Sequence, residues 1–259
     1  MKDHINILVI PDTHADPLHS NDRFTTLGNF IVSRKPEIII QIGDFATMSS
    51  LSSYDVGKRK SEGRRYADDI EVTIDAQEKL FDPIHKDNRG RTRSKYEPEL
   101  HITLGNHEDR INRAANDDPA LYQYLTTDDL KFKEYGWNVV PFKQFLNIRN
   151  INFTHYFPNG LMDRPIGGQN PARGILQRWH CSGVQGHSHV FNTATDVKAD
   201  GTRITAVVAG CYFEHGEDFV SDSIQRTWWR GVVMLNNVNM KGEFDLEQVS
   251  LESMKRDFS

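Results

Sequence analysis

The sequence has 259 residues, of which 37% are hydrophobic and 26% charged, and its formal net charge is −5. This length supports one sizeable α/β domain with a proper core, or at most two small domains. The acidic balance argues against a protein covered in positive charge for nucleic-acid binding, although local basic patches are compatible with it. No apolar run approaches the ~18 residues needed to span a bilayer, so no membrane segment is expected.

The start of the chain and the cysteine content bear on the compartment. The segment MKDHINILVIPDTH has only a short apolar run and does not resemble a signal peptide. Cys181 and Cys211 are the only cysteines in the sequence, and they form no CxxC pattern. We therefore expect a reduced, cytoplasmic protein.

The first part of the chain has the pattern of a β-α-β unit. Residues 5–10 (INILVI) and 37–42 (EIIIQI) are short β-branched apolar runs, typical of buried strands. Between them a helix is expected, capped by Asn21 or Asp22 and stopped by Lys35-Pro36.

A third buried strand is expected at 99–104 (ELHITL), and the stretch before it, at about 48–98, is an insertion. Apolar residues from Tyr66 to Ile84 have close to helical spacing. Basic runs flank this helix, YDVGKRKSEGRRY before it and KDNRGRTRSK after it. We interpret the insertion as a helical, basic-flanked excursion from a single domain that spans residues 1–259.

After Trp137 the pattern changes to β-hairpins. Turns are expected around Asn150, around Asp200-Gly201 and around Lys241-Gly242, each between two strand-like runs. The chain thus begins as βαβ and ends largely as antiparallel β. The predicted fold class is α/β, with one domain built on a mixed, two-sheet core.

Similar polar residues follow each predicted strand. They are Asp12 and His14, Asp44, Asn106 and His107, His155, and finally His187 and His189. The carboxyl ends of neighbouring strands line one crevice in α/β folds, so these residues are expected to converge. Carboxylate, imidazole and amide oxygen are ligands of borderline divalent metals such as Mn, Fe, Zn or Ni. The sequence therefore predicts a metal centre at the strand ends.

These ligands divide into two sites. One ion would be bound by Asp12, His14, Asp44 and His189, and the other by Asp44, Asn106, His155 and His187. Asp44 would bridge the two ions, about 3.5–4 Å apart as in two-metal hydrolases. Two nearby cations acidify bound water, so a bridging hydroxide would be available near neutral pH. The expected cofactors are two divalent ions, with manganese favoured and Fe, Zn or Ni as alternatives.

The series D-x-H, G-D, G-N-H-E, H and G-H-x-H, from Asp12 to His189, resembles the calcineurin-like metallophosphoesterase superfamily. The resemblance implies a four-layer α/β/β/α sandwich of two mixed β-sheets with flanking helices, and a two-metal site at the strand ends. The phrases GDFATMSSLSSYDVGK and GGQNPARGIL are similar to those of phage- or prophage-encoded members.

The resemblance implies the same metal ligands and gives His107 a separate role. His107 would be the non-ligand catalytic histidine that protonates the leaving-group oxygen. Asn106 would help the ions to neutralise charge on the phosphoryl group, and Asp44 would hold both ions. Many members orient this histidine with an acid three positions after the G-D aspartate, where this sequence has Thr47. The candidates that remain open as its substitute are Asp55, Glu108 and Asp109.

Substrate contacts are expected from the segment 160–176, which lies between the His155 and His187 strands. It contains Arg164, Arg173 and a predicted helix start at Asn170-Pro171, whose N–H groups could face an anion. An ordinary surface loop is the equally open alternative. His215 follows a later strand and could approach the same face. The basic runs of the insertion could reach a polyanion such as nucleic acid, and solvated helix ends explain them nearly as well.

Three functions are compatible with these patterns. The first is a metal-dependent phosphoesterase that hydrolyses a phosphodiester in a nucleotide or nucleic acid. The second keeps the chemistry and changes the substrate to a phosphomonoester, small or protein-borne. The third is a metal-binding scaffold without catalysis, for which Thr47 in place of the usual acid is the supporting feature. The sequence leaves the natural substrate and the oligomeric state open.

Overall fold

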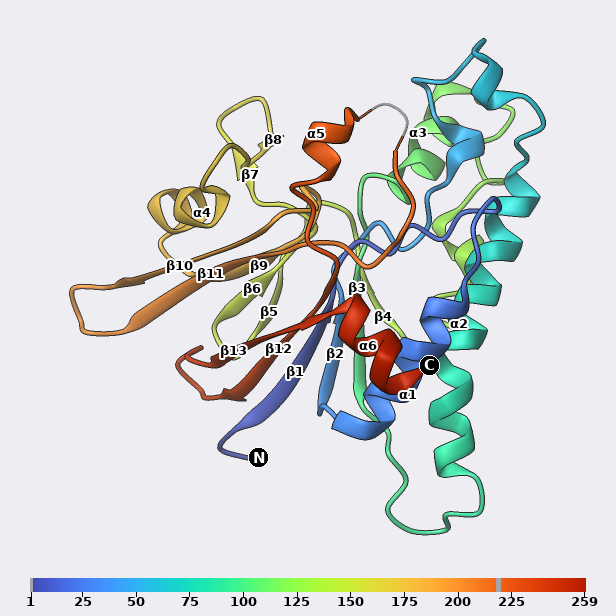
Figure 1. The fold of residues 1–259 in the computed structure, drawn as a ribbon. Helices are drawn as coiled ribbons and strands as arrows, with labels where there is room; N and C mark the ends of the chain where they lie inside the picture. Colours follow the sequence, from blue (N-terminus) through green and yellow to red (C-terminus); the bar gives the residue numbers. More distant parts are fainter. Residues whose placement is uncertain (1, 218–219) are drawn as a thin grey trace.

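The computed structural model describes residues 2–217 and 220–259. It is an α/β structure with two multi-stranded mixed sheets (Figure 1). The helices are α1 Asp22–Arg34, α2 Tyr66–Asn88, α3 Asp109–Asp117, α4 Pro171–Trp179, α5 Asp222–Gln225 and α6 Leu251–Phe258, with 3-10 turns η1 Ser49–Leu51, η2 Arg59–Ser61 and η3 Thr127–Leu130. The predicted α/β class is confirmed.

The first sheet has the strand order β13-β12-β1-β2-β3-β4. Its strands are β1 Ile5–Ile10, β2 Ile38–Gln41, β3 Glu99–Thr103, β4 Asn138–Val140, β12 Gly231–Val238 and β13 Asp245–Ser250. Strands β1 to β4 are parallel, whereas β12 and β13 pair antiparallel. The sheet is therefore mixed, and the carboxyl ends of its four adjacent parallel strands, β1 to β4, lie along the same edge.

The second sheet has the strand order β10-β11-β9-β6-β5. Its strands are β5 Leu146–Ile148, β6 Ile151–Phe153, β9 Ser182–Gln185, β10 Phe191–Val197 and β11 Arg203–Ala209. Strand β9 runs parallel to both β6 and β11, and the outer pairs are antiparallel. A separate two-stranded hairpin, β7 Pro158–Asn159 with β8 Arg164–Pro165, lies beyond β6. The hairpins predicted around Asn150 and Asp200-Gly201 are confirmed, as is the one between β12 and β13.

Strand β1 is buried on both of its faces, by the second sheet on one side and by helices on the other. Ile7 and Val9 pack against the second sheet, while Leu8 and Ile10 pack against the helices. Both sets are at most 1% exposed. A strand covered on both sides needs no polar face, which is why INILVI reads as a continuous apolar run.

Helices cover the outer faces and complete four layers. Helices α1, α2 and α6 pack beside one another over the first sheet, and α4 packs on β10 and β11 of the second (Figure 1). Gly28 of α1 sits so close to α2 that an added Cβ would lie 2.5 Å from the Leu80 carbonyl oxygen. Helix α2, which the sequence predicts inside the insertion, therefore belongs to the helical layer of the domain.

Helices α3 and α5 and the β7–β8 hairpin lie around the edge of the sheets where the parallel strands end (Figure 1).

No helix within residues 2–217 and 220–259 combines the length and the apolar character that crossing a membrane requires.

Candidate metal centre

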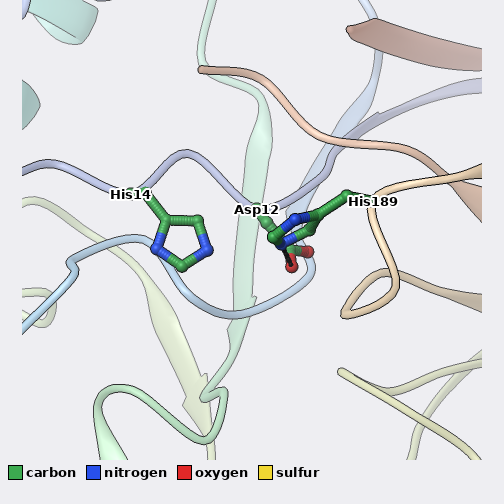
Figure 2. Close-up of side chains that lie close together, drawn as sticks. All are labelled: Asp12, His14 and His189. Atoms are coloured by element: carbon green, nitrogen blue, oxygen red, sulfur yellow. Dashed lines mark ion pairs between the residues drawn. The ribbon is translucent and has the colours of Figure 1, made fainter. Parts of the chain in front are cut away.

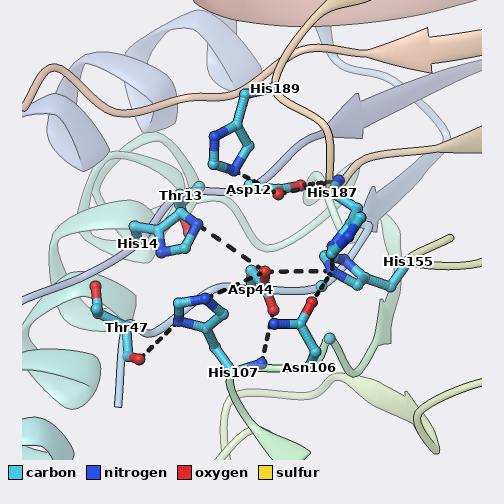
Figure 3. A network of polar contacts seen from close by, with 12 residues as sticks. Asp12, Thr13, His14, Asp44, Thr47, Asn106, His107, His155, His187 and His189 are labelled. Atoms are coloured by element: carbon cyan, nitrogen blue, oxygen red, sulfur yellow. Dashed lines mark hydrogen bonds and ion pairs between the residues drawn. The ribbon is translucent and has the colours of Figure 1, made fainter. Parts of the chain in front are cut away.

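Five strands deliver polar side chains to one edge of the two sheets (Figure 3). The residues that follow β1, β2, β3, β6 and β9 are Asp12 and His14, Asp44, Asn106 and His107, His155, and His187 with His189, respectively. The first three strands belong to one sheet and the last two to the other. Segments far apart in the chain meet here because the parallel strands of both sheets end at the same edge.

The first cluster consists of Asp12, His14 and His189 (Figure 2). One ligand atom from each of the three side chains lies within 4.8 Å of the others. The His189 Nε2 atom is 3.0 Å from Oδ2 of Asp12. The backbone N–H of His187 donates to the same carboxylate at 3.0 Å. The carboxylate is thus held by the backbone while an imidazole approaches it from the other side.

The second cluster consists of Asp44, His155 and His187, whose ligand atoms also lie within 4.8 Å of one another. The His155 Nε2 atom is 3.2 Å from Oδ2 of Asp44 and 2.9 Å from Oδ1 of Asn106. It is also 3.1 Å from Nδ1 of His187. Four ligand-type atoms that crowd around one point form the arrangement expected of a cation site.

Asp44 lies between the two clusters (Figure 3). Its Oδ2 atom is 3.2 Å from His155 Nε2 on one side and 4.0 Å from His14 Nε2 on the other. Its Oδ1 atom accepts a hydrogen bond of 2.9 Å from the backbone N–H of His107. The structure thus brings together all seven of the ligands expected from the sequence, with Asp44 where a shared ligand would lie.

Two glycines allow the carboxylates to occupy these positions. A Cβ on Gly105 would lie 2.1 Å from Oδ1 of Asp44, and a Cβ on Gly186 would lie 2.2 Å from Oδ1 of Asp12. Both distances are far below van der Waals contact, so a side chain at either position would displace a carboxylate. Glycine is therefore needed at these two positions so that the carboxylates of Asp44 and Asp12 can lie against the backbone.

Four of the candidate ligands have left-handed backbone conformations. The φ angles are 44° at His14, 51° at Asp44, 68° at His187 and 59° at His189. For a residue with a side chain this conformation costs roughly 1–2 kcal/mol. Such strain concentrates at functional sites, where the surrounding structure holds it in place.

The polar groups of the site fit a cation. His14 is 1% exposed, and neither ring nitrogen has a hydrogen-bond partner among the described residues. The carboxylates of Asp12 and Asp44 are 0% and 2% exposed. Buried charges are normally paired or coordinated to a metal. A divalent ion near His14 would supply the partner that the imidazole lacks.

The pKa values of the histidines in the cluster are shifted in opposite directions. Burial alone would lower the pKa of His155, but the Asp44 carboxylate outweighs it and raises the pKa to about 9. Burial opposes ionisation of Asp44 too, yet the facing histidines, His155 first, keep its pKa well below the usual range. Burial lowers the pKa of both His107 and His187 to about 4. His155 and Asp44 therefore form a buried ion pair, and the rings of His107 and His187 are neutral.

His107 is oriented by a backbone group. Its Nδ1 atom is 2.7 Å from the carbonyl oxygen of Thr47. Because a carbonyl only accepts, Nδ1 carries the proton and donates it. The acids left open by the sequence, Asp55, Glu108 and Asp109, form no hydrogen bond with this ring among the described residues. Position 47 still orients the histidine, through its main chain rather than its side chain.

Glu108 has a different task. It is fully buried, and its carboxylate accepts hydrogen bonds from the backbone N–H groups of Asp44 (3.0 Å), Ala46 (3.0 Å) and Gly105 (2.7 Å). These contacts tie the loop after β2 to the loop after β3. Burial, with Asp44 adding to it, raises the pKa of Glu108 to about 7.

An aromatic wall closes one side of the first cluster, and the sequence gives no signal for it. The ring of Phe213 lies 4.8 Å from that of His14 and 5.1 Å from that of His189. Trp228 lies edge-on to His189 at 4.7 Å. Both aromatic residues come from the connection between β11 and β12, which no ligand motif marks.

Of the expected substrate residues, the two arginines lie farther out, whereas His215 lies beside the first cluster. Arg173 of α4 forms an ion pair with Asp196 at 3.1 Å, and Arg164 lies exposed in β8. Among the described residues, neither contacts the ligand cluster. His215 stacks on His19 with ring centroids 4.0 Å apart, and it lies 4.7 Å from Phe213, next to the first cluster.

Comparison with known proteins gives little at the level of sequence. No family model matches the chain, and neither does any curated protein. One solved structure aligns over 95% of this chain and 100% of its own, with a TM-score of 0.44 and 12% identity. A second, TT1561 of Thermus thermophilus, aligns over 96% of this chain and 99% of its own, with a TM-score of 0.37 and 9% identity.

Proposed function

We propose that this protein is a binuclear metal-dependent phosphoesterase of the calcineurin-like type, and that it hydrolyses a phosphodiester in a nucleotide or nucleic acid. The observation that carries the proposal is the buried Asp44 carboxylate between two clusters of imidazoles. The first ion would be held by Asp12, His14, Asp44 and His189, and the second by Asp44, Asn106, His155 and His187. Two divalent ions, with manganese favoured, would supply a nucleophile from water near neutral pH and positive charge for the phosphoryl oxygens.

His107 and Asn106 would act on the substrate directly. Because Nδ1 of His107 is fixed on the Thr47 carbonyl, Nε2 is the atom free to exchange a proton with the leaving-group oxygen. The Asn106 side chain reaches the second cluster through its Oδ1 atom, 2.9 Å from His155 Nε2. There it would help the ions to neutralise the charge that develops on the phosphoryl group.

The charge near the site favours a diester over a monoester. Arg173 is paired with Asp196, and the arginine that reaches His107 is Arg110, 3.4 Å from the ring. A diester carries one negative charge, whereas a monoester carries up to two and needs more cationic partners. Arg110 and Arg113, whose Nη2 donates to the Asn106 carbonyl oxygen at 2.8 Å, are the arginines that contact this part of the cluster, and we infer that they suit the singly charged substrate.

The deciding experiment compares bis-(4-nitrophenyl) phosphate with 4-nitrophenyl phosphate on metal-stripped protein resupplied with Mn. We expect faster turnover of the diester, its loss in His107→Ala with metal content nearly intact, and loss of metal in Asp44→Asn. His85→Ala, an exposed histidine on α2, is the matched control and should keep full activity. Preference for the monoester would favour a phosphatase. Absence of turnover despite two bound ions would favour a metal-binding scaffold.

A further inference from the structure

Arg110 lies in the first turn of α3, three residues after His107, and its guanidinium reaches the same loop. Nη1 donates to the carbonyl oxygens of Thr47 at 2.9 Å and Met48 at 3.2 Å. Nη2 lies 3.4 Å from Nε2 of His107. The Thr47 carbonyl therefore accepts from both the histidine ring and the arginine, and it fixes the two side chains relative to each other.

The direction of these hydrogen bonds follows from the donors. Since Nδ1 of His107 donates to Thr47, Nε2 of the neutral ring has a lone pair and faces an N–H of Arg110. Arginine has donors only and keeps its charge. A fixed cation thus lies beside the one nitrogen of His107 that can meet a substrate.

The two ends of the guanidinium have different roles. Nη1 is used by backbone carbonyls, which hold the group in place without neutralising its charge. The hydrogen bonds of the guanidinium go to these carbonyls and to the His107 ring, and the carboxylates of Asp44, Glu217 and Asp55 act on its charge electrostatically. A charge held rigidly by carbonyl dipoles needs no reorganisation during a reaction, and such preorganised charge contributes most to catalysis.

We propose that Arg110 is a catalytic residue on the leaving-group side, where its Nη2–H contacts the departing oxygen and stabilises the negative charge that develops there. The inference rests on the proposed phosphoesterase function and adds a residue to it. As a water oxygen forms its bond to phosphorus, the P–O bond to the leaving group breaks, and the departing oxygen keeps the electron pair and takes up a proton from water, directly or relayed through the Nε2 lone pair of His107. Arg110 is unchanged at the end of the step.

The function of Arg110 predicts a dependence on the leaving group that a structural role does not. A poor leaving group builds more negative charge on its oxygen and needs the cation more. We would measure kcat and KM on two diesters of thymidine 5′-phosphate, with 4-nitrophenol as the good leaving group and phenol as the poor one. The variants are Arg110→Gln and Arg110→Lys, and Arg34→Gln is the control because Arg34 pairs with Glu247 at the far end of α1.

For Arg110→Gln we expect kcat on the phenyl ester to fall by about 10²–10³-fold, the size typical for loss of one charge-stabilising donor. The fall on the 4-nitrophenyl ester should be at least ten times smaller, with metal content and melting temperature close to those of the wild type. Arg110→Lys should be intermediate, and added guanidinium should restore part of the phenyl ester activity of Arg110→Gln.

Equal losses on both esters, or a loss that follows metal content, would overturn the proposal and leave Arg110 as a tie between α3 and the Thr47 loop. No loss on either ester would also overturn it. A wild-type protein inactive on both esters with its ions bound would refute the proposed phosphodiesterase function itself, and the role of Arg110 with it. The two failures are therefore distinguishable.

Discussion

Two of the candidate metal ligands have opposite surroundings in the metal-free protein, and the same substitution should affect them in opposite ways. His14 is 1% exposed, with no hydrogen-bond partner for either ring nitrogen among the described residues. His155 is fully buried as well, but Nδ1 lies 3.1 Å from the Ile42 carbonyl oxygen and Nε2 lies 3.2 Å from Asp44. The perturbation is leucine at each position, since leucine is apolar and of similar volume.

The expected free energies of unfolding follow from these contacts. At position 14, leucine removes two buried polar atoms, each of which costs about 1–3 kcal/mol when unpaired. Leucine also has to adopt the left-handed φ of 44° that His14 has, a strain of roughly 1–2 kcal/mol that the wild type partly shares. His14→Leu should therefore be as stable as the wild type in chelator, or more stable by about 1–2 kcal/mol.

At position 155, leucine removes the positive partner of a buried carboxylate. Breaking one side of a buried ion pair costs about 3–5 kcal/mol because the remaining charge is uncompensated. The two variants should thus differ by several kcal/mol although both lose a ligand.

The assay is urea unfolding of the wild type and both variants, once with chelator and once with excess Mn. In the wild type, an ion at 100 times its Kd should add about 2.7 kcal/mol of stability. Both variants should lose most of this increment. If His14→Leu were destabilised in chelator as much as His155→Leu, the assignment of His14 as a metal ligand without another partner would be wrong. It would also be wrong if His14→Leu kept the full gain in stability on metal binding.

Three further predictions concern packing and protonation. Gly105→Ala should cost about 1–3 kcal/mol and reduce the metal content measured by mass spectrometry, since its Cβ would lie 2.1 Å from a ligand carboxylate; Gly167→Ala, which meets no atom within 4 Å, should change neither. Burial lowers the pKa of His107 and His187 to about 4 from 6.5, so the stability that each contributes is complete above pH 6.5 and is lost as the pH falls through 4. The slope should be about 1.4 kcal/mol per pH unit for each group, and urea titrations of chelated protein that were flat from pH 6.5 to 4.5 would contradict it. Because Asp44 outweighs burial and raises the pKa of His155 to about 9, this ring is protonated before metal binds, and calorimetry at pH 7.5 in two buffers should detect about one released proton.

The framework of this fold can be predicted because the relevant signals are local. The run 5–10 is apolar throughout, and the structure covers β1 on both faces, as such a run requires. The α1 helix begins at Asp22 and ends at Arg34, where the polar start and the Lys35-Pro36 stop predict its ends. Once the strands are known, the ends of the strands are known too, and the ligand motifs lie there.

Other features of the site cannot be predicted from the types of residues in the sequence. The partner of His107 is a main-chain carbonyl, and any residue at position 47 would offer one. Helix α3 follows the GNHE motif directly, and its only buried side chains are Ile111 and Ala115, too few for a clear helical period. Phe213 reaches His14 through the packing of distant loops, which a single sequence does not encode locally.

The hydrogen bonds between the Glu108 side chain and three main-chain N–H groups can be tested by one substitution. One carboxylate oxygen accepts from the N–H groups of Asp44 and Gly105, and the other accepts from Ala46. In Glu108→Gln, one of the two oxygens becomes an NH₂ group, so at least one backbone donor would face another donor. An unmet buried donor costs about 1–3 kcal/mol.

We therefore expect Glu108→Gln to lower the free energy of unfolding by about 1–3 kcal/mol and to weaken metal binding, because Glu108 holds the strained backbone of Asp44 in place. Unfolding in urea and the metal content after dialysis are the measurements, and Glu71→Gln on the exposed face of α2 is the control. If Glu108 oriented His107 instead, as the sequence alone allows, the variant would keep its stability and its metal and lose only kcat. That result would refute the hydrogen-bond assignment, since a carboxylate occupied by three backbone N–H groups cannot also hold the ring that the Thr47 carbonyl binds.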